Sequence, residues 1–157
     1  MSQFVPPRPR LISVKRGFVL VASQFNAAYV EGLVTHCTDE LQTLSPASNV
    51  TLHRVPGAFE IPIVVREMAA KDGVDAIVAL GVILQGKTAH AQHLGQTVTQ
   101  ALQQISLQYG VPVIHAVLTL QNEAQARKRC LENEINRGTE AARAAFDMAN
   151  LLADLRR

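Results

Sequence analysis

Two kinds of segment alternate along this chain, and they differ in the spacing of their apolar residues. Short stretches rich in β-branched residues predict strands that are buried on both faces, as in a parallel sheet. They cover residues 17–23, 49–55, 74–84 and 113–120. In the segments between them, apolar residues recur at helical spacing, which predicts helices with one buried side. These helices cover residues 27–44, 59–71, 88–109 and 123–132, and an alanine-rich helix follows Gly138.

The order of these elements, β-α-β-α-β-α-β-α-α, predicts the fold class. Strict alternation of strands and helices favours a parallel sheet with right-handed crossovers and helices on both faces. We therefore expect an α/β protein, a three-layer αβα sandwich with a four-stranded parallel sheet of the flavodoxin-like type. Residues 17–157 are predicted to form a single domain. Residues 1–16, which include three prolines, are predicted to form an extended N-terminal arm.

Composition and charge narrow the classes of function. The chain has 157 residues and is 48% hydrophobic, enough for one domain with its own core. Its formal charge of +2 and its lack of Trp argue against nucleic-acid binding. No apolar run is long enough to span a bilayer, and the proline-rich start lacks the apolar part of a signal peptide. Cys37 and Cys130 suit reduced thiols, so we expect a cytoplasmic protein without a metal site.

Ligands of parallel α/β sheets bind beyond the carboxyl ends of the strands. In this chain the rule selects four loops, residues 23–26, 55–60, 85–90 and 120–125. Asn26, Thr88 and Asn122 stand where helices begin, so they are expected to cap them. The candidate chemistry of the chain is therefore expected at one edge of the sheet.

The segment GVILQGKTAH (residues 81–90) begins with a match to the nucleotide-binding pattern G-x-x-x-x-G-K-[ST]. Its Gly-Lys-Thr corner at a helix start is the kind of backbone that attracts phosphate. However, its letters VIL fit a continuing strand and not a loop that wraps phosphates. An acidic residue at the end of another apolar strand, which would hold magnesium, is also missing. The segment therefore favours a phosphate site, and a P-loop nucleotide-binding protein is the distant alternative.

Taken together, the four loops resemble those of the lumazine synthase family. The matching segments are SQFN (23–26), VPGAFEIP (55–62), GVILQGKTAH (81–90), GVPVIHAVLT (110–119), NEAQARKR (122–129) and NRGTEAARAAFDMANLL (136–152). They are collinear over nearly the whole chain. VPGAFEIP, followed at this spacing by the G-x-T-x-H corner, is highly specific for the family.

The resemblance implies a reaction. Members of this family join 5-amino-6-ribitylamino-uracil to 3,4-dihydroxy-2-butanone 4-phosphate and form 6,7-dimethyl-8-ribityllumazine, the penultimate step of riboflavin biosynthesis. An amine attacks the ketone to give an imine, phosphate is eliminated, and a second amine closes the ring with loss of water. No metal or organic cofactor is implied. Such a transferase must position two substrates, hold an anion and transfer protons.

The resemblance also implies roles for individual residues. His90 matches the proton-transfer histidine, and imidazole suits that task because it titrates near neutrality. Of the five histidines, His90 is the one placed two residues after the phosphate corner. The other implied site residues bind substrate, and they are Phe25, Asn26, Ala58, Phe59, Glu60, Ile83, Leu84, Lys87, Thr88, His115, Arg129 and Arg137.

These substrate-binding residues fall into groups by their implied partner. Lys87, Thr88 and Arg129 hold phosphate, Arg129 with a bidentate guanidinium. Phe25 stacks on the pyrimidine ring, while Asn26 and Glu60 lie near the ribityl chain and the ring edge. The remaining implied contacts come from the backbone of Ala58 and Phe59, from the pocket wall at Ile83 and Leu84, and from His115 and Arg137 of a neighbouring subunit. Purely structural alternatives exist for several of them: core packing for Phe25, capping for Asn26 and Thr88, the helix dipole for Glu60, and a solvated charge for Arg129.

The chain departs from the family pattern at several positions. Gln85 replaces an arginine, and Lys87 adds a charge near the phosphate. Ala91 and Gln92 stand in place of an aromatic and an acidic residue. His115 replaces an aromatic residue and Arg137 a lysine, whereas Glu140 occupies the place of the acidic partner of the catalytic histidine. These changes put the pyrimidine contacts in doubt and leave the phosphate residues and His90 intact.

The resemblance further implies a homo-oligomer whose active sites lie between subunits of a pentamer. In the family, twelve pentamers can close into a hollow shell. The N-terminal arm is expected to lie along a partner. Besides the synthase and the P-loop protein, a flavin- or pyrimidine-binding paralogue of low activity is a third hypothesis, suggested by the departures after His90.

Overall fold

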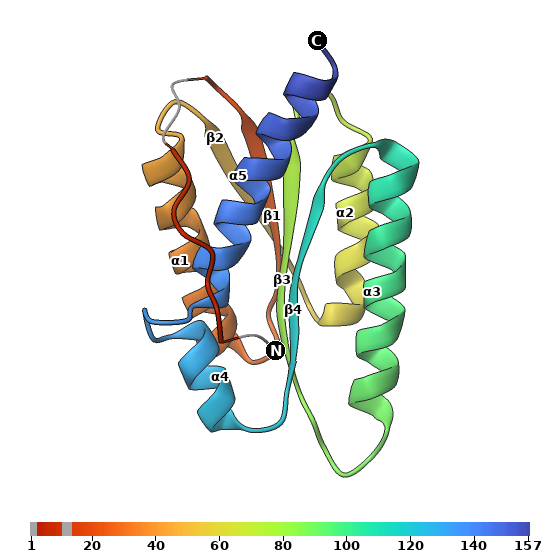
Figure 1. The fold of residues 1–157 in the computed structure, drawn as a ribbon. Coiled ribbons are helices and arrows are strands. Elements are labelled where there is room, and N and C mark those ends of the chain that lie inside the picture. Colours follow the sequence, from red (N-terminus) through yellow and green to blue (C-terminus); the bar gives the residue numbers. More distant parts are fainter. Residues whose placement is uncertain (1–2, 11–13) are drawn as a thin grey trace.

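The computed structural model of this protein describes residues 3–10 and 14–157 (Figure 1). The described residues form one parallel sheet from the strands β1 (Gly17–Ser23), β2 (Asn49–Val55), β3 (Ala76–Leu84) and β4 (Val113–Leu120). The helices are α1 (Ala27–Leu44), the short 3-10 helix η1 (Ala58–Glu60), α2 (Ile61–Ala69), α3 (His90–Tyr109), α4 (Glu123–Cys130) and α5 (Arg137–Leu155).

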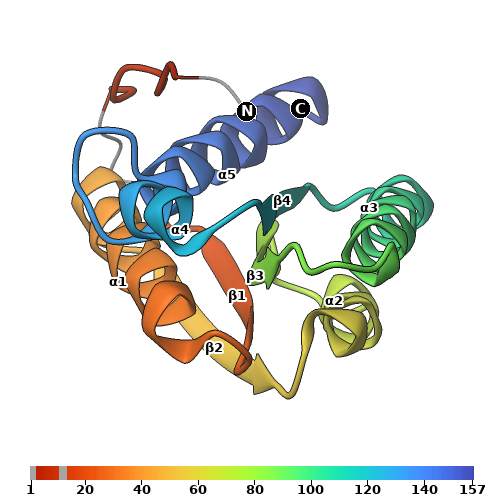
Figure 2. The ribbon, with the colours of Figure 1, turned by 90° about the horizontal axis from the view of Figure 1, so that it is seen from below.

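The sheet lies between two layers of helices, with the strand order β2-β1-β3-β4. Figure 2, which looks at the carboxyl ends of the strands, shows α1, α4 and α5 on one face and α2 and α3 on the other. All three strand pairs are parallel. The predicted αβα sandwich with a four-stranded parallel sheet is confirmed.

The core follows from the alternation of side chains along the strands. In β1, Phe18, Leu20 and Ala22 pack with α1, α4 and α5, whereas Val19 and Val21 pack with α2 and α3. β3 is buried from its first residue to Ile83. Both faces of the sheet are covered by helices. The most apolar strands, β1 and β3, are therefore buried more completely than β2.

Element bounds differ from the predicted ones mainly at helix ends. The predicted helix 59–71 is divided into η1 and α2, and Pro62 stands in the first turn of α2, where a missing N–H costs little. β3 begins at Ala76, α3 at His90 and α5 at Arg137, and α4 ends at Cys130. The strands β1, β2 and β4 have their predicted bounds.

Two of the three predicted helix caps are wrong. Asn122 does cap α4, because its side chain accepts a hydrogen bond from Gln125 N at 2.9 Å. Asn26 instead adopts a left-handed backbone conformation (φ 56°), and its amide donates to the carbonyl oxygen of Val82 at 2.7 Å. The N-cap position of α3 is Ala89, so Thr88 lies one residue too early. Its hydroxyl accepts only a long hydrogen bond (3.4 Å) from His90 N.

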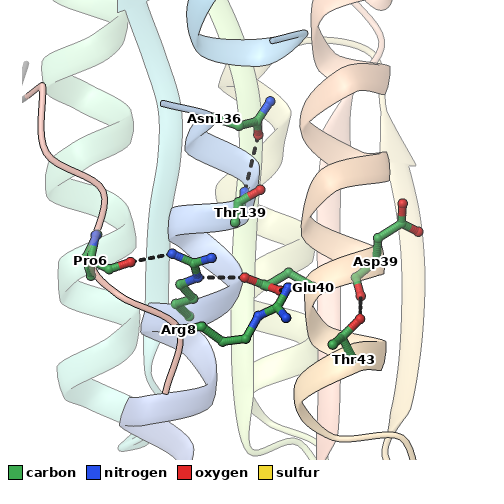
Figure 3. A network of polar contacts seen from close by, with 8 residues as sticks. Pro6, Arg8, Asp39, Glu40, Thr43, Asn136 and Thr139 are labelled. Carbon is green, nitrogen blue, oxygen red and sulfur yellow. Dashed lines mark hydrogen bonds and ion pairs between the residues drawn. The ribbon is translucent and has the colours of Figure 1, made fainter. Parts of the chain in front are cut away.

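The described part of the arm runs along α1 and α5 (Figure 1). Arg8 Nη2 and Arg143 Nε donate to the two oxygens of Glu40, each at 2.6 Å, and Arg143 also donates to the Pro6 carbonyl (Figure 3). Glu40 lies on α1 and is 4% exposed. Burial by itself raises the pKa of this carboxyl, but the hydrogen bonds from the two arginines outweigh it and lower the pKa. The arm boundary at residue 16 stays a prediction, and residues 1–2 and 11–13 of the arm lie outside the described residues.

The two cysteines are buried free thiols. Burial raises the pKa of both, that of Cys130 to about 12. No helix in residues 3–10 and 14–157 combines the length and apolarity that a membrane span requires.

The Glu40 cluster predicts a pH-dependent contribution to stability. Glu40→Gln should lower the free energy of unfolding by about 1–2 kcal/mol at neutral pH, because it removes the charge and replaces one of the two oxygens that accept from Arg143 and the half-exposed Arg8 with an NH2 donor. Since the folded-state pKa of Glu40 is lowered, this contribution is present above the ordinary value of 4.5 and is lost as the pH falls through the folded value. Urea unfolding of both proteins at several pH values measures it.

Asp39→Asn is the matched control, because Asp39 is the exposed neighbour of Glu40 on the same helix. It removes the same charge and should change stability little. An equal effect of the two substitutions, or an effect of Glu40→Gln that persists at low pH, contradicts the assignment.

Candidate active site

A cavity of about 400 Å³, here called the loop cavity, opens at the carboxyl ends of β1, β2 and β3. It is lined by Phe25, Asn26, Gly57, Ala58, Phe59, Glu60, Val82, Ile83, Leu84, His90 and Leu94. The structure thus brings together eight of the residues predicted for the site, from the loop after β1, from η1, from the end of β3 and from the start of α3. These eight are Phe25, Asn26, Ala58, Phe59, Glu60, Ile83, Leu84 and His90.

Main-chain hydrogen bonds tie the first two loops of this cavity together. Gln24 N donates to Val55 O at 2.8 Å, and Phe25 N donates to Pro56 O at 3.2 Å. The left-handed backbone of Asn26 then turns the chain into α1, and its amide holds the end of β3. As a result the Phe25 ring is left 73% exposed beside the cavity. An exposed aromatic ring at a concave site is a typical feature of a ligand or subunit contact.

The polar groups of the loop cavity come from Glu60 and His90. Glu60 accepts a hydrogen bond from the Gly57 N–H at 2.9 Å, which holds its carboxylate over the turn before η1. His90 is the first residue of α3, and its side chain is exposed where it lines the cavity. An acidic group and an imidazole thus border one mostly apolar pocket, an arrangement that suits proton transfer to a flat ligand.

A second cavity of about 350 Å³, here called the edge cavity, lies along β4 at the edge of the sheet. It is lined by Ile114, His115, Ala116, Val117, Leu118, Thr119, Arg137, Glu140, Ala141 and Ala144. The two residues predicted to serve a neighbouring subunit, His115 and Arg137, are therefore together here, and Glu140 is with them. They do not line the loop cavity of their own chain.

Arg137 is the most distinctive group in the edge cavity. It is 5% exposed, and its Nη1 donates to the Glu140 carboxylate and, at 3.4 Å, to the Phe4 carbonyl. Its Nε and Nη2 are buried without a hydrogen-bond partner among the described residues. Buried donors are normally satisfied, so these two are available to an acceptor from a ligand or another subunit.

The position of Arg137 depends on the residues on either side of it. Asn136 caps α5 by accepting from Gly138 N at 2.8 Å, and its amide donates to the Cys130 carbonyl at 2.9 Å. A Cβ on residue 138 would lie 2.4 Å from the Leu33 carbonyl oxygen, so only glycine lets α5 begin this close to α1. The Asn-Arg-Gly segment therefore forms the start of α5.

The predicted phosphate residues are placed apart from both cavities. Lys87 and Thr88 are exposed in the loop between β3 and α3, and Arg129 is 7% exposed on α4. Among the described residues, neither cavity is lined by these three or by residues 120–125. A phosphate site built from all three is not assembled within one cavity of a single chain.

The nucleotide-binding pattern has no structural counterpart. Its residues Gly81–Leu84 belong to β3, where Val82 and Ile83 are register partners of Leu118 and Thr119 in β4. Their backbone is therefore engaged in the sheet and cannot wrap a triphosphate. This result removes the P-loop alternative.

The sequence did not predict Leu94 or Thr99 as site residues. Leu94 lines the loop cavity one turn after His90, and its helical spacing could have revealed this. Thr99 contacts His115 from α3, with Oγ1 2.7 Å from Nε2. No local pattern predicts that contact, because it joins two elements that only the fold brings together.

Comparison with known proteins agrees with the geometry. A sequence model of the 6,7-dimethyl-8-ribityllumazine synthase family matches residues 15–153. The chain is also 39% identical over 137 residues to a protein of Leptothrix cholodnii named 6,7-dimethyl-8-ribityllumazine synthase, covering 87% of this chain and 86% of that one. The chain therefore belongs to the 6,7-dimethyl-8-ribityllumazine synthase family.

Proposed function

We propose that this protein condenses 5-amino-6-ribitylamino-uracil with 3,4-dihydroxy-2-butanone 4-phosphate to 6,7-dimethyl-8-ribityllumazine, releasing phosphate and water. The observation that carries the proposal is the loop cavity of a chain of this family. There an exposed Phe25 ring, the Glu60 carboxylate and the His90 imidazole border one pocket of about 400 Å³. Such a pocket suits a flat, polar-edged heterocycle.

Each of these groups has a task in the reaction. Phe25 offers its ring face to the pyrimidine. Glu60 and the amide of Asn26 lie where polar groups can meet the ring edge and the ribityl hydroxyls. His90 accepts a proton from the attacking amine and returns one as imine formation expels water. Holding both substrates in one pocket also lowers the entropic part of the barrier.

The phosphate of the second substrate is expected at the start of α3. The loop carrying Lys87 and Thr88 leads into that helix, whose first backbone N–H groups and positive dipole end favour an anion. Arg129, held at 7% exposure on α4, is the proposed third phosphate group.

We further propose that the chain forms a pentamer and that its active site is shared between neighbouring copies. Twelve such pentamers can assemble into a hollow shell. The support is the separation of the predicted residues: His90 lines the loop cavity, whereas His115, Arg137 and Glu140 line the edge cavity. In a ring of copies, each loop cavity can face the edge cavity of the next chain. The two donors of Arg137 that lack a partner among the described residues would then meet substrate at that interface.

The cysteines and the charge of the chain bear on its compartment and its partners. The free, buried Cys37 and Cys130 support a reducing compartment, and we propose the cytoplasm. The small formal charge of +2 supports small-molecule substrates and gives no support for a nucleic-acid partner.

The direct test is to incubate the purified protein with both substrates and to follow lumazine fluorescence. Formation of the product supports the synthase. Absence of product at high enzyme concentration contradicts it, and tight binding of the lumazine without turnover would instead indicate a pyrimidine-binding paralogue.

Replacing His90 should mainly reduce the rate of the chemical step. His90→Ala is expected to lower kcat about 100-fold or more, because a positioned acid–base group contributes about 10²–10⁴. The sedimentation profile should not change, since His90 is exposed. His93→Ala is the matched control one turn along the same exposed helix face and should retain activity. If His90→Ala stays as active as His93→Ala and the original protein, His90 is excluded from proton transfer.

Mixing two inactive variants tests the shared site. His90→Ala and Arg137→Ala should each be nearly inactive alone, while co-refolding them in equal amounts should restore about a quarter of the sites, those that combine intact groups from two chains. Activity of the mixture is measured against each variant treated in the same way. If both groups act within one chain, the mixture stays as inactive as its components.

A further inference from the structure

His115 uses both of its ring nitrogens within its own chain. Val117 N donates to Nδ1 at 3.1 Å, so Nδ1 carries no proton. Nε2, which lies 2.7 Å from Thr99 Oγ1, must then carry it. The Thr99 hydroxyl donates its own proton to the Gly95 carbonyl at 2.7 Å and therefore accepts from Nε2. One tautomer of a neutral imidazole satisfies the whole chain of bonds.

The same contacts keep the ring neutral. A proton on Nδ1 would point at the Val117 N–H, and the bond between them would be lost. The pKa of His115 is lowered in the same direction, because loss of solvent around the ring outweighs a hydrogen bond to its own backbone, which raises the pKa.

The backbone of α3 places Thr99 within reach of the ring. A Cβ on residue 95 would lie 2.9 Å from the Thr119 Oγ1, so a glycine there lets α3 lie close to β4. Gly95 is also the residue whose carbonyl orients the Thr99 hydroxyl. The contact therefore depends on how closely α3 packs on β4, although Thr99 and His115 are both exposed.

With both nitrogens engaged, His115 has no donor or acceptor left for a ligand. What remains for a ligand is the flat face of a neutral ring, and His115 lines the edge cavity together with Arg137 and Glu140. Such a face stacks on a heteroaromatic ring as other aromatic side chains do. A histidine held in this way can serve where an aromatic residue would otherwise be needed.

We propose that Thr99 is a positioning residue, which fixes the imidazole of His115 so that its face, and not a nitrogen, meets the pyrimidine substrate. This inference rests on the proposed function and extends it to a residue outside the predicted site. The contrary hypothesis is that His115 turns to hydrogen-bond the substrate through Nε2, in which case Thr99 would compete with binding.

The experiment is a double-mutant cycle with Thr99→Val and His115→Phe. The KM for the pyrimidine substrate, kcat, and the Kd of the fluorescent lumazine product are measured for each variant. Thr99→Val should raise KM and Kd about fivefold, the factor typical of one lost hydrogen bond, and leave kcat unchanged. His115→Phe should bind nearly as well as the original protein, and adding Thr99→Val to it should have no further effect.

Two further variants separate this role from general packing. Thr99→Ser keeps the hydroxyl, so its KM for the pyrimidine substrate and its Kd for the lumazine should equal those of the original protein. Thr97→Val, a control at another exposed threonine of α3, should leave them unchanged. The proposal is overturned if Thr99→Val has no effect, if it tightens binding, or if its effect is the same in the His115→Phe background.

The same measurements distinguish a failure of the proposed synthase activity from a failure of the proposed role of Thr99. Without turnover in the original protein the proposed synthase fails, while the Kd of the lumazine still reports the Thr99–His115 pair. With turnover but no coupling between the two positions, the synthase stands and the role of Thr99 is refuted. Failure of the original protein to bind the lumazine would overturn both.

Discussion

The burial of β3 on both faces is the constraint on which the candidate site depends. β3 pairs with β1 on one side and β4 on the other, and its side chains pack into both helical layers. Its backbone is thus held at every step, and the position of its carboxyl end is determined by the core. Asn26 binds that end through the Val82 carbonyl, and the following loop leads to His90. The loop cavity is the result.

Most of the predicted site residues of this chain are divided between two cavities. The loop cavity offers an aromatic ring, a carboxylate and an imidazole, whereas the edge cavity offers Arg137, two of whose donors have no partner in the described part of the chain. A buried guanidinium is stable only when its donors find acceptors. Within residues 3–10 and 14–157, one nitrogen of this guanidinium is satisfied, through Glu140 and Phe4. The unsatisfied donors of Arg137 are the physical reason to expect that a neighbouring subunit, or a substrate bound at an interface, supplies the missing acceptors.

Departures from a family pattern have structural consequences that depend on their surroundings. His115, a polar residue in place of an aromatic one, is accompanied by a hydroxyl on α3 and by a backbone N–H of its own strand, which together occupy its polar atoms. Arg137 likewise stands between a capping Asn136 and a Gly138 that is packed against α1. In each case the neighbours decide which property of the side chain remains available.

The sequence by itself determined the alternation of strands and helices, three of the four strand bounds and the family, because buried strands and helical stripes are patterns of adjacent residues. It also pointed to the loops of the cavity. The tertiary structure decided what individual polar residues do. Asn26 was expected to cap a helix, yet its amide is drawn to a carbonyl 56 positions away, and His115 is held by a threonine 16 positions away. Such side chains bind the strongest partner within reach, and only the folded chain determines which partner that is.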